Sequence, residues 1–298
     1  MKRTLFLLTF AISLMLCGCG SQDAPAQIAA TTLPVYEFTS RLCEGTPLTV
    51  TRLVTEEVSC LHDYSLNVRQ VKAAEAAETI VISGAGLEEF LEDLLLGAET
   101  IDASHGVELI QPEEHSHEHE DGEHDHGHEG HSHDRDPHIW LSPANAMTMA
   151  ENICTGLSEK YPEQKERFSA NLETLLEDLT ALQAYGETTL ESLSCRELIT
   201  FHDGFAYLAQ AFDLTILEAI EEESGSEASA KELIHMIEEV EHHNLPAIFT
   251  EKSGSVSAAG ILSRETGAKT YTLDMSMSGD SYFDAMRHNI DTLKEALG

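Results

Sequence analysis

The feature that most constrains the fold is a long amphipathic stretch in the middle of the chain, from Glu163 to Leu193. Its apolar side chains recur at helical spacing and share one stripe: Phe168, Leu172, Leu175, Leu176, Leu179 and Leu182. Pro162 stands near the start, where a helix tolerates proline, although Gly186 weakens the later turns. Such a helix spans about 46 Å. We predict a rigid connector between two parts of the molecule rather than a core element of either.

On both sides of this stretch, short apolar or β-branched runs alternate with helical patterns. On the N-terminal side these predict strands at 48–50 and 79–82 and helices at 35–42 and 87–96. On the C-terminal side they predict strands at 197–200, 247–250 and 269–273 and helices at 204–212, 231–241 and 284–297. This alternation indicates an α/β fold with mostly parallel sheets covered by helices. We therefore predict two similar lobes, hinged or braced by the long helix.

The N-terminus has the pattern of an export signal. Lys2 and Arg3 precede an apolar run from Leu5 to Leu16, which is shorter than the roughly 20 residues of a membrane-spanning helix. The run ends at a segment that resembles a bacterial lipoprotein processing site, with Cys19 as the acylated residue. We expect an extracytoplasmic protein, held on the bacterial cell membrane only by its N-terminal lipid. A soluble secreted protein with two spare cysteines is the alternative.

These patterns divide the chain into five segments. Residues 1–19 form the signal peptide and 20–27 a tether. The N-terminal lobe, linking helix and C-terminal lobe follow at 28–160, 161–194 and 195–298. A length of 298 residues suits two lobes better than one core.

A histidine-rich tract, residues 113–135, interrupts the N-terminal lobe. It has no large apolar side chain to bury, so we predict a mobile surface loop. Its histidines alternate with acidic residues and glycine: His115, His117, His119, His124, His126, His128, His131 and His133. Changing subsets of imidazoles suit an auxiliary metal site, weaker than a preformed one because binding must order the chain. A charged loop that merely tolerates metal is the alternative.

Charge excludes some classes of partner. The chain has 17 Lys and Arg against 53 Asp and Glu, a formal net charge of −36. Nucleic acid and anionic membrane surfaces need phosphate-neutralising cations, so neither is an expected partner. The charge fits a protein that concentrates cations, although acidity that only secures solubility remains open.

Four cysteines lie outside the signal segment: Cys43, Cys60, Cys154 and Cys195. An even number permits disulfides outside the cytosol, but four cysteines allow three pairings and the sequence does not choose among them. The absence of a CxxC pair argues against a thiolate zinc site.

Four candidate ligands each follow a predicted strand or loop: His62, His138, His202 and Asp274. Ligands of open α/β sheets gather beyond the carboxyl ends of the strands, so two facing lobes can bring these residues into one cleft. Three imidazoles and a carboxylate form a tetrahedral set that suits Zn²⁺ better than Mg²⁺ or Ca²⁺. A single histidine after a strand is usually only a polar loop residue, so spacing alone does not make a site.

The segments around these residues resemble the metal-specific solute-binding proteins of bacterial ABC importers, the ZnuA/TroA-like zinc and manganese family. In chain order they are 62–66, 136–143, 201–205 and 272–274. The second, DPHIWLSP, resembles the family's DPHxWLxP pattern and is the most specific. The likeness runs over essentially the whole mature chain.

The resemblance implies that His62, His138 and His202 are metal ligands. Asp274 matches the position that supplies a carboxylate ligand in many members of the family. In some zinc-specific members, water takes the place of this carboxylate. His202 favours zinc, because manganese-type members have a glutamate there. Some zinc members have a glutamate before the first histidine, where this chain has Leu61. Zinc-type members also commonly carry a histidine-rich loop.

Three carboxylates near these ligands have open roles. Asp63 and Asp203 follow ligand histidines, and either orients an imidazole or, as we prefer, caps a loop or helix. Glu251 is expected to be solvated or to face the other lobe.

The implied function is capture of Zn²⁺ outside the cell, by a monomer, for an ABC permease and its ATPase. The alternatives are a manganese-specific member, an adhesin of the same fold and a zinc hydrolase. The sequence has no HExxH, Gly-x-Ser-x-Gly or phosphate-binding glycine loop, and a carboxylate that closes the metal shell leaves no open position for substrate. We therefore do not expect an enzyme.

Overall fold

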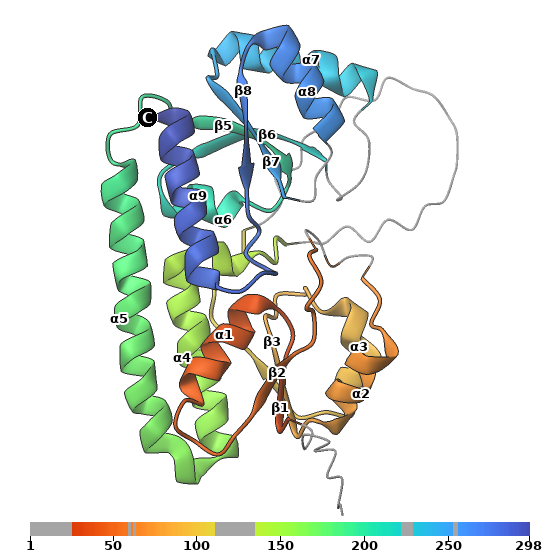
Figure 1. Ribbon diagram of the computed structural model, residues 1–298, viewed down its shortest axis with the longest axis vertical. Helices are drawn as coiled ribbons and strands as arrows, with labels where there is room; N and C mark the ends of the chain where they lie inside the picture. The colour runs from red at the N-terminus through yellow and green to blue at the C-terminus, as the bar shows by residue number, and fades with distance from the viewer. Residues whose placement is uncertain (1–25, 59–60, 62–63, 111–134, 222–228, 253–255) are drawn as a thin grey trace, which may run out of the picture.

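The computed structural model describes residues 26–58, 61, 64–110, 135–221, 229–252 and 256–298. These residues form two α/β lobes stacked along the long axis of the molecule, with a long helix running beside both (Figure 1). Each lobe contains one four-stranded sheet, and every strand pairing is parallel. The predicted fold class is therefore confirmed.

The sheet of the N-terminal lobe is covered by helices on both faces. Its strand order is β2 (Val50–Arg52), β1 (Ile28–Ala30), β3 (Thr79–Ile82), β4 (Thr100–Asp102). Ile28 and Val81 point into the core shared with α1 (Leu33–Leu42) and α4 (Pro143–Lys160). Ala29 and Ile80 point to the opposite face, toward α2 (Val68–Ala76) and α3 (Glu92–Leu95). Both faces are apolar because both are buried, as expected for a parallel sheet.

The C-terminal lobe repeats this arrangement. Its strand order is β6 (Thr215–Glu221), β5 (Glu197–His202), β7 (Ala247–Glu251), β8 (Lys269–Leu273). Ile199 and Ile248 pack on one face in a cluster with residues of α7 (Ala230–His243) and α8 (Val256–Thr266). Leu198 and Phe249 pack on the other face in a cluster with residues of α6 (Ala206–Ala211) and α9 (Tyr282–Leu297). The carboxyl ends of these strands supply two of the predicted site residues.

The long helix, α5 (Lys165–Leu190), corrects one sequence-based expectation. It begins after the short 3₁₀ helix η3 (Pro162–Gln164) and its 26 residues extend about 39 Å. Its stripe is buried against α4, α1 and α9, and belongs to a hydrophobic cluster that continues through both lobes. The prediction that this helix is not a core element is therefore wrong. The apolar stripe explains this, because so many large apolar side chains are stable only when buried.

The predicted helix at 87–96 is interrupted, and this too has a local cause. The structure has a 3₁₀ helix, η1 (Glu89–Leu91), followed by the four residues of α3. Just before them, the buried Glu88 carboxylate accepts hydrogen bonds from the backbone N–H groups of Ser83 (2.7 Å) and Gly84 (3.0 Å). Gly84 has φ +82°, and a side chain there would overlap Asp102. The turn after β3 is thus fixed by Glu88.

Hydrogen bonds brace the two lobes. The indole N–H of Trp140 donates to the Met275 carbonyl at 2.8 Å, and the Tyr282 hydroxyl donates to the Trp140 carbonyl at 2.8 Å. Burial raises the pKa of Tyr282, so its hydroxyl keeps the proton it donates. The Arg52 guanidinium donates to the Gly279 carbonyl at 2.7 Å. Of the two predicted possibilities, hinged or braced, the structure has braced lobes.

The structure describes only part of two sequence features, the cysteines and the segments considered for membrane attachment. Cys43, Cys154 and Cys195 form no disulfide in the described part of the chain, and burial raises the pKa of Cys43 to about 12, which keeps it a thiol. Cys60 and the proposed lipid-bearing Cys19 lie outside the described residues. Among the helices that are described, none combines the length and apolar character required to cross a bilayer.

Gly186 provides a test of the shared core. It is buried in α5, and a methyl group added to it would overlap the ring of Phe212 from the C-terminal lobe. We expect Gly186→Ala to lower the free energy of unfolding by about 1–2 kcal/mol, because overpacking outweighs the roughly 1 kcal/mol gain in helix propensity. Urea denaturation followed by circular dichroism measures the change.

Gly260→Ala is the matched control. Gly260 lies in α8, and an added methyl group would meet only Arg264, at 3.6 Å. This substitution should stabilise the protein by up to about 1 kcal/mol. Equal stabilisation by both substitutions would contradict close packing of Phe212 against α5.

Candidate metal centre

The structure describes three of the four predicted ligands: His138, His202 and Asp274. The fourth, His62, lies outside the described residues, as do Asp63 and all eight histidines of the predicted auxiliary site: His115, His117, His119, His124, His126, His128, His131 and His133.

His138 and His202 come from different lobes and meet between them. His202 is the last residue of β5, and His138 directly precedes the 3₁₀ helix η2 (Ile139–Leu141). Their ring centroids are 5.4 Å apart, the ring planes cross at 83°, and each residue is only 2% exposed. Trp140, which hydrogen-bonds to the segment after β8, fixes η2 against the C-terminal lobe. The tie between the lobes therefore also brings the two imidazoles together.

Asp136 orients the imidazole of His138. Its Nδ1 lies 2.8 Å from Asp136 Oδ1, which also accepts the His138 backbone N–H at 2.8 Å. An ionised carboxylate only accepts hydrogen bonds, so in the neutral form of the imidazole Nδ1 carries the proton and Nε2 carries a lone pair. His138 Nε2 is buried and has no hydrogen-bond partner among the described residues. A buried lone pair of this kind suits a metal ion, and Asp136 provides the carboxylate–histidine contact that metal sites commonly use.

Tyr207 holds the segment that carries Asp136. Its hydroxyl donates to the Asp136 carbonyl at 3.1 Å and accepts the backbone N–H of Ile110 at 2.9 Å. Burial raises the pKa of Tyr207 to about 12, so the hydroxyl remains protonated and can make both bonds. Asp136 is thereby fixed from the C-terminal lobe. Asp203, one of the two carboxylates considered for such a role, is exposed.

Gly204 permits the close approach of the two histidines. A Cβ at this position would lie 2.8 Å from His202 Cδ2, 3.1 Å from His138 Cε1 and 2.6 Å from Met275 Cε. The distance to the His202 ring is shorter than real Cβ atoms show, so a side chain at this position would displace that ring. The sequence placed Gly204 at the start of a helix, but α6 begins at Ala206.

Asp274 follows β8, as predicted, and both of its carboxylate oxygens are engaged. Oδ1 accepts the backbone N–H of Ser276 at 2.8 Å, and Oδ2 lies 3.0 Å from the Lys252 ammonium. Asn289 of α9 fixes the backbone, because it bonds to both the N–H and the carbonyl of Asp274 at 2.7 Å. Among the described residues, no three metal-binding side chains converge as a ready-made site. In the described structure His138 therefore lies against His202, and Asp274 forms an ion pair with Lys252.

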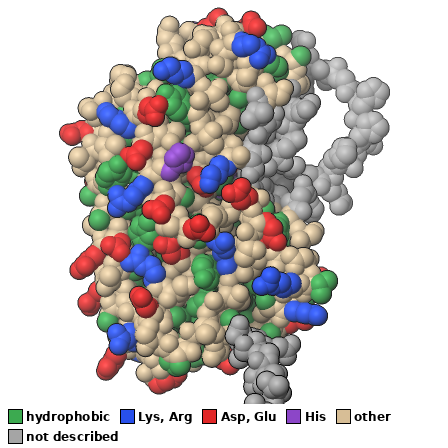
Figure 2. All heavy atoms as spheres, in the orientation of Figure 1, with side chains coloured by type: hydrophobic (Ala, Val, Ile, Leu, Met, Phe, Trp, Pro, Cys, Tyr) green, Lys and Arg blue, Asp and Glu red, His purple; other side chains and the backbone are tan. Residues whose placement is uncertain are grey.

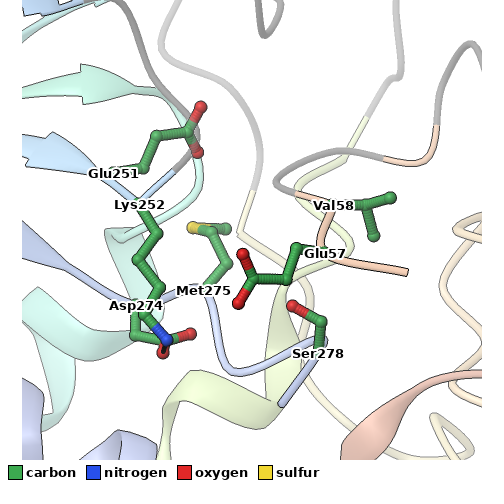
Figure 3. A pocket seen from close by; sticks show the side chains of 7 residues that line it. All are labelled: Glu57, Val58, Glu251, Lys252, Asp274, Met275 and Ser278. Atoms are coloured by element: carbon green, nitrogen blue, oxygen red, sulfur yellow. Dashed lines mark ion pairs between the residues drawn. The ribbon is translucent and has the colours of Figure 1, made fainter. Parts of the chain in front are cut away.

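A pocket of about 10 Å³ lies beside Asp274 between the two lobes (Figure 3). Its lining residues are Glu57, Val58, Glu251, Lys252, Asp274, Met275 and Ser278. The volume matches one water-sized sphere and leaves no room for an organic substrate. Three carboxylates and one ammonium belong to the residues that line it, so the lining has a net negative charge that attracts cations.

Sequence reasoning missed the roles of Lys252 and Asp136, and its expectation for the surroundings of Glu251 was only partly correct. Glu251 ends β7 and is 3% exposed, so it is not solvated, although it does line the pocket between the lobes. A signal for Glu251 and Lys252 was available. Strand β7 lies between β5 and β8, so residues at its carboxyl end must reach the same edge as His202 and Asp274.

On the face shown in Figure 2, the described surface has no large patch of a single charge sign. Acidic and basic side chains are interspersed there over both lobes. Long-range attraction of a cation on that face therefore comes from the overall net charge of −36 rather than from one patch.

The chain matches proteins of known families over nearly all of its length. Residues 28–296 match the family described as zinc-uptake complex component A, periplasmic (ZnuA). The zinc-binding lipoprotein AdcA of Streptococcus pneumoniae strain TIGR4 is 33% identical, over 99% of this chain and 61% of AdcA. The chain thus spans less than two thirds of the AdcA relatives.

Two further comparisons agree with this. The high-affinity zinc uptake system protein ZnuA of Bacillus subtilis is 29% identical, over 96% of this chain and 95% of that protein. The crystal structure of Zn(II)-bound AdcA from Streptococcus pneumoniae has a TM-score of 0.73 and 29% identity, and covers 91% of this chain and 57% of AdcA. With residues 28–296 matched and two braced α/β lobes, the chain belongs to the ZnuA family of solute-binding proteins for transport.

Proposed function

We propose that this protein binds Zn²⁺ outside the cytoplasm and delivers it to an ABC permease that works with an ATPase. The observation that carries the proposal is the buried pair of imidazoles, His138 and His202, with His138 Nε2 left open by the Asp136 contact. Imidazole nitrogen is a preferred zinc ligand, at about 2.0–2.1 Å from the metal. The zinc ion is the cargo and undergoes no reaction.

The proposed ligands are His62, His138, His202 and Asp274. Leu61, the described residue that precedes His62 in the sequence, is buried in the main core. Three neutral imidazoles and a carboxylate favour Zn²⁺ over Mn²⁺, because manganese prefers harder oxygen ligands. The small pocket beside Asp274 supports a binding protein rather than a zinc hydrolase.

The relatives support the choice of metal and the location. Their names describe zinc binding, a lipoprotein and high-affinity zinc uptake, and one solved relative contains Zn(II). We propose the same cargo for this chain, with Cys19 as the lipid-bearing residue and the protein acting as a monomer on the outer side of the cell membrane. Delivery requires release, which is consistent with a site that performs no covalent chemistry.

Removal of one proposed imidazole tests the site. We expect His138→Ala to lower zinc affinity by more than the roughly 10- to 100-fold that is typical for loss of an outer hydrogen-bonding partner. Chelator-competition titration of the apo-protein measures this, with the exposed His105→Ala as the control. Wild-type affinity in His138→Ala would rule out the proposed centre.

The same titration at two pH values tests the protonation state of the ligands. Imidazoles bind zinc only when neutral, and the ordinary pKa of histidine is about 6.5. Zinc affinity of the wild type should therefore be lower at pH 5.5 than at pH 7.5. Equal affinity at both pH values would contradict ligation by histidine.

Asp136→Asn tests the orientation of His138. An amide oxygen is a weaker acceptor than a carboxylate, so the imidazole loses basicity and its fixed tautomer. We expect zinc affinity to fall about 10- to 100-fold, with the free energy of unfolding of the apo-protein little changed. Asp93→Asn, which removes an exposed carboxylate of α3, should bind zinc like the wild type. Equal effects of the two substitutions would indicate a general loss of charge.

The histidine-rich tract, whose structure lies outside the described residues, is proposed as an auxiliary site that captures metal for the main one. Deletion of residues 113–135 should leave one tightly bound zinc per chain and remove weaker additional sites, because the proposed ligands lie elsewhere. Isothermal titration of both forms gives the number of sites. Loss of the tight site on deletion would refute this division of roles.

A further inference from the structure

The contact between Lys252 and Asp274 places a side-chain cation on a proposed metal ligand. The ammonium lies 3.0 Å from Asp274 Oδ2, while the other oxygen, Oδ1, accepts the backbone N–H of Ser276. The Asp274 side chain is only 11% exposed, whereas that of Lys252 is 52% exposed. The carboxylate is therefore held in place, and the lysine is the partner with freedom to leave.

A second carboxylate faces Lys252 from the opposite lobe. The Glu57 side chain points toward the Lys252–Asp274 pair across the pocket (Figure 3). Lysine carries a positive charge at neutral pH, so Asp274 and Glu57 each offer the ammonium an opposite charge. Lys252 is on the C-terminal lobe, directly after β7, and Glu57 is on the N-terminal lobe, after β2. An ammonium released from Asp274 thus has an acceptor within the same pocket.

A divalent cation and the Lys252 ammonium compete for one carboxylate. When zinc coordinates Asp274, the two positive charges repel each other at short range, and the burial of the carboxylate leaves this repulsion only partly screened by water. The long, flexible lysine stem allows the head group to move away. Metal entry therefore requires the ion pair to break, and metal exit allows it to form again.

We propose that Lys252 is an internal competitor for the cargo, which neutralises Asp274 when no metal is bound and is displaced from it by zinc. This inference rests on the proposed function and extends it, since it assigns control of affinity and release to a residue outside the ligand set. A lysine in this role lowers the zinc affinity of the site below the affinity that the ligands alone would give. When zinc leaves, the Lys252 ammonium takes its place beside Asp274. The carboxylate is then not left as an uncompensated, nearly buried charge.

Zinc affinity and dissociation rate of Lys252→Met test the proposal. Methionine keeps much of the apolar stem and removes the charge. Chelator competition should show about tenfold tighter binding than the wild type, and stopped-flow chelation should show slower release. In the Asp274→Asn background the same substitution should change zinc affinity little, because the carboxylate for which zinc and Lys252 compete is gone. Lys252→Arg, which keeps the charge, should bind no more tightly than the wild type.

Lys269→Met is the matched control for net charge. Lys269 is exposed at the opposite end of β8 from Asp274, so its removal changes the overall charge equally but not the pair. Circular dichroism of each apo-variant establishes that it is folded. The proposal is overturned if Lys252→Met binds zinc as the wild type does or more weakly, or if Lys269→Met tightens binding equally. Failure of the wild type to bind zinc through His138 would instead refute the proposed function.

Discussion

The structure depends on burial of the α5 stripe in one hydrophobic core that both lobes share. Phe168 and Leu175 pack in the same cluster as Phe38 of the N-terminal lobe and Phe249 of the C-terminal lobe. His138 and His202 come from different lobes, so their separation is set by this core and by the bonds of Trp140 across it. A metal site built from two lobes needs such a frame, because ligand geometry tolerates only small displacements.

Local patterns in the sequence were sufficient for much of the fold. Strands β3 and β8 begin and end where β-branched runs predicted, and the end-of-strand rule placed His202 and Asp274 at the correct edge. The sequence did not reveal that α5 joins the core, because an amphipathic stripe does not identify what covers it. Contacts between distant residues, such as Trp140 with Met275 or Lys252 with Asp274, are invisible to periodicity because nothing local encodes them.

The electrostatics of the proposed ligands suit reversible capture of a metal ion. Asp136 fixes one imidazole and Gly204 leaves room for the second, so binding needs little rearrangement of these rings. Asp274 is the adjustable member, since its Oδ2 is shared with an ammonium. A transport protein needs both properties: preorganised nitrogen ligands give selectivity, whereas a contested oxygen ligand keeps binding from becoming permanent.

The shared core also has a consequence for how the protein loses its structure. Two sheets usually suggest two folding units, yet here the apolar surface of each lobe is completed by α4, α5 and α9. Separation of the lobes would expose to water the apolar side chains of α5 that pack against the lobe it loses. We therefore expect the two lobes to unfold as one cooperative unit rather than as two independent modules.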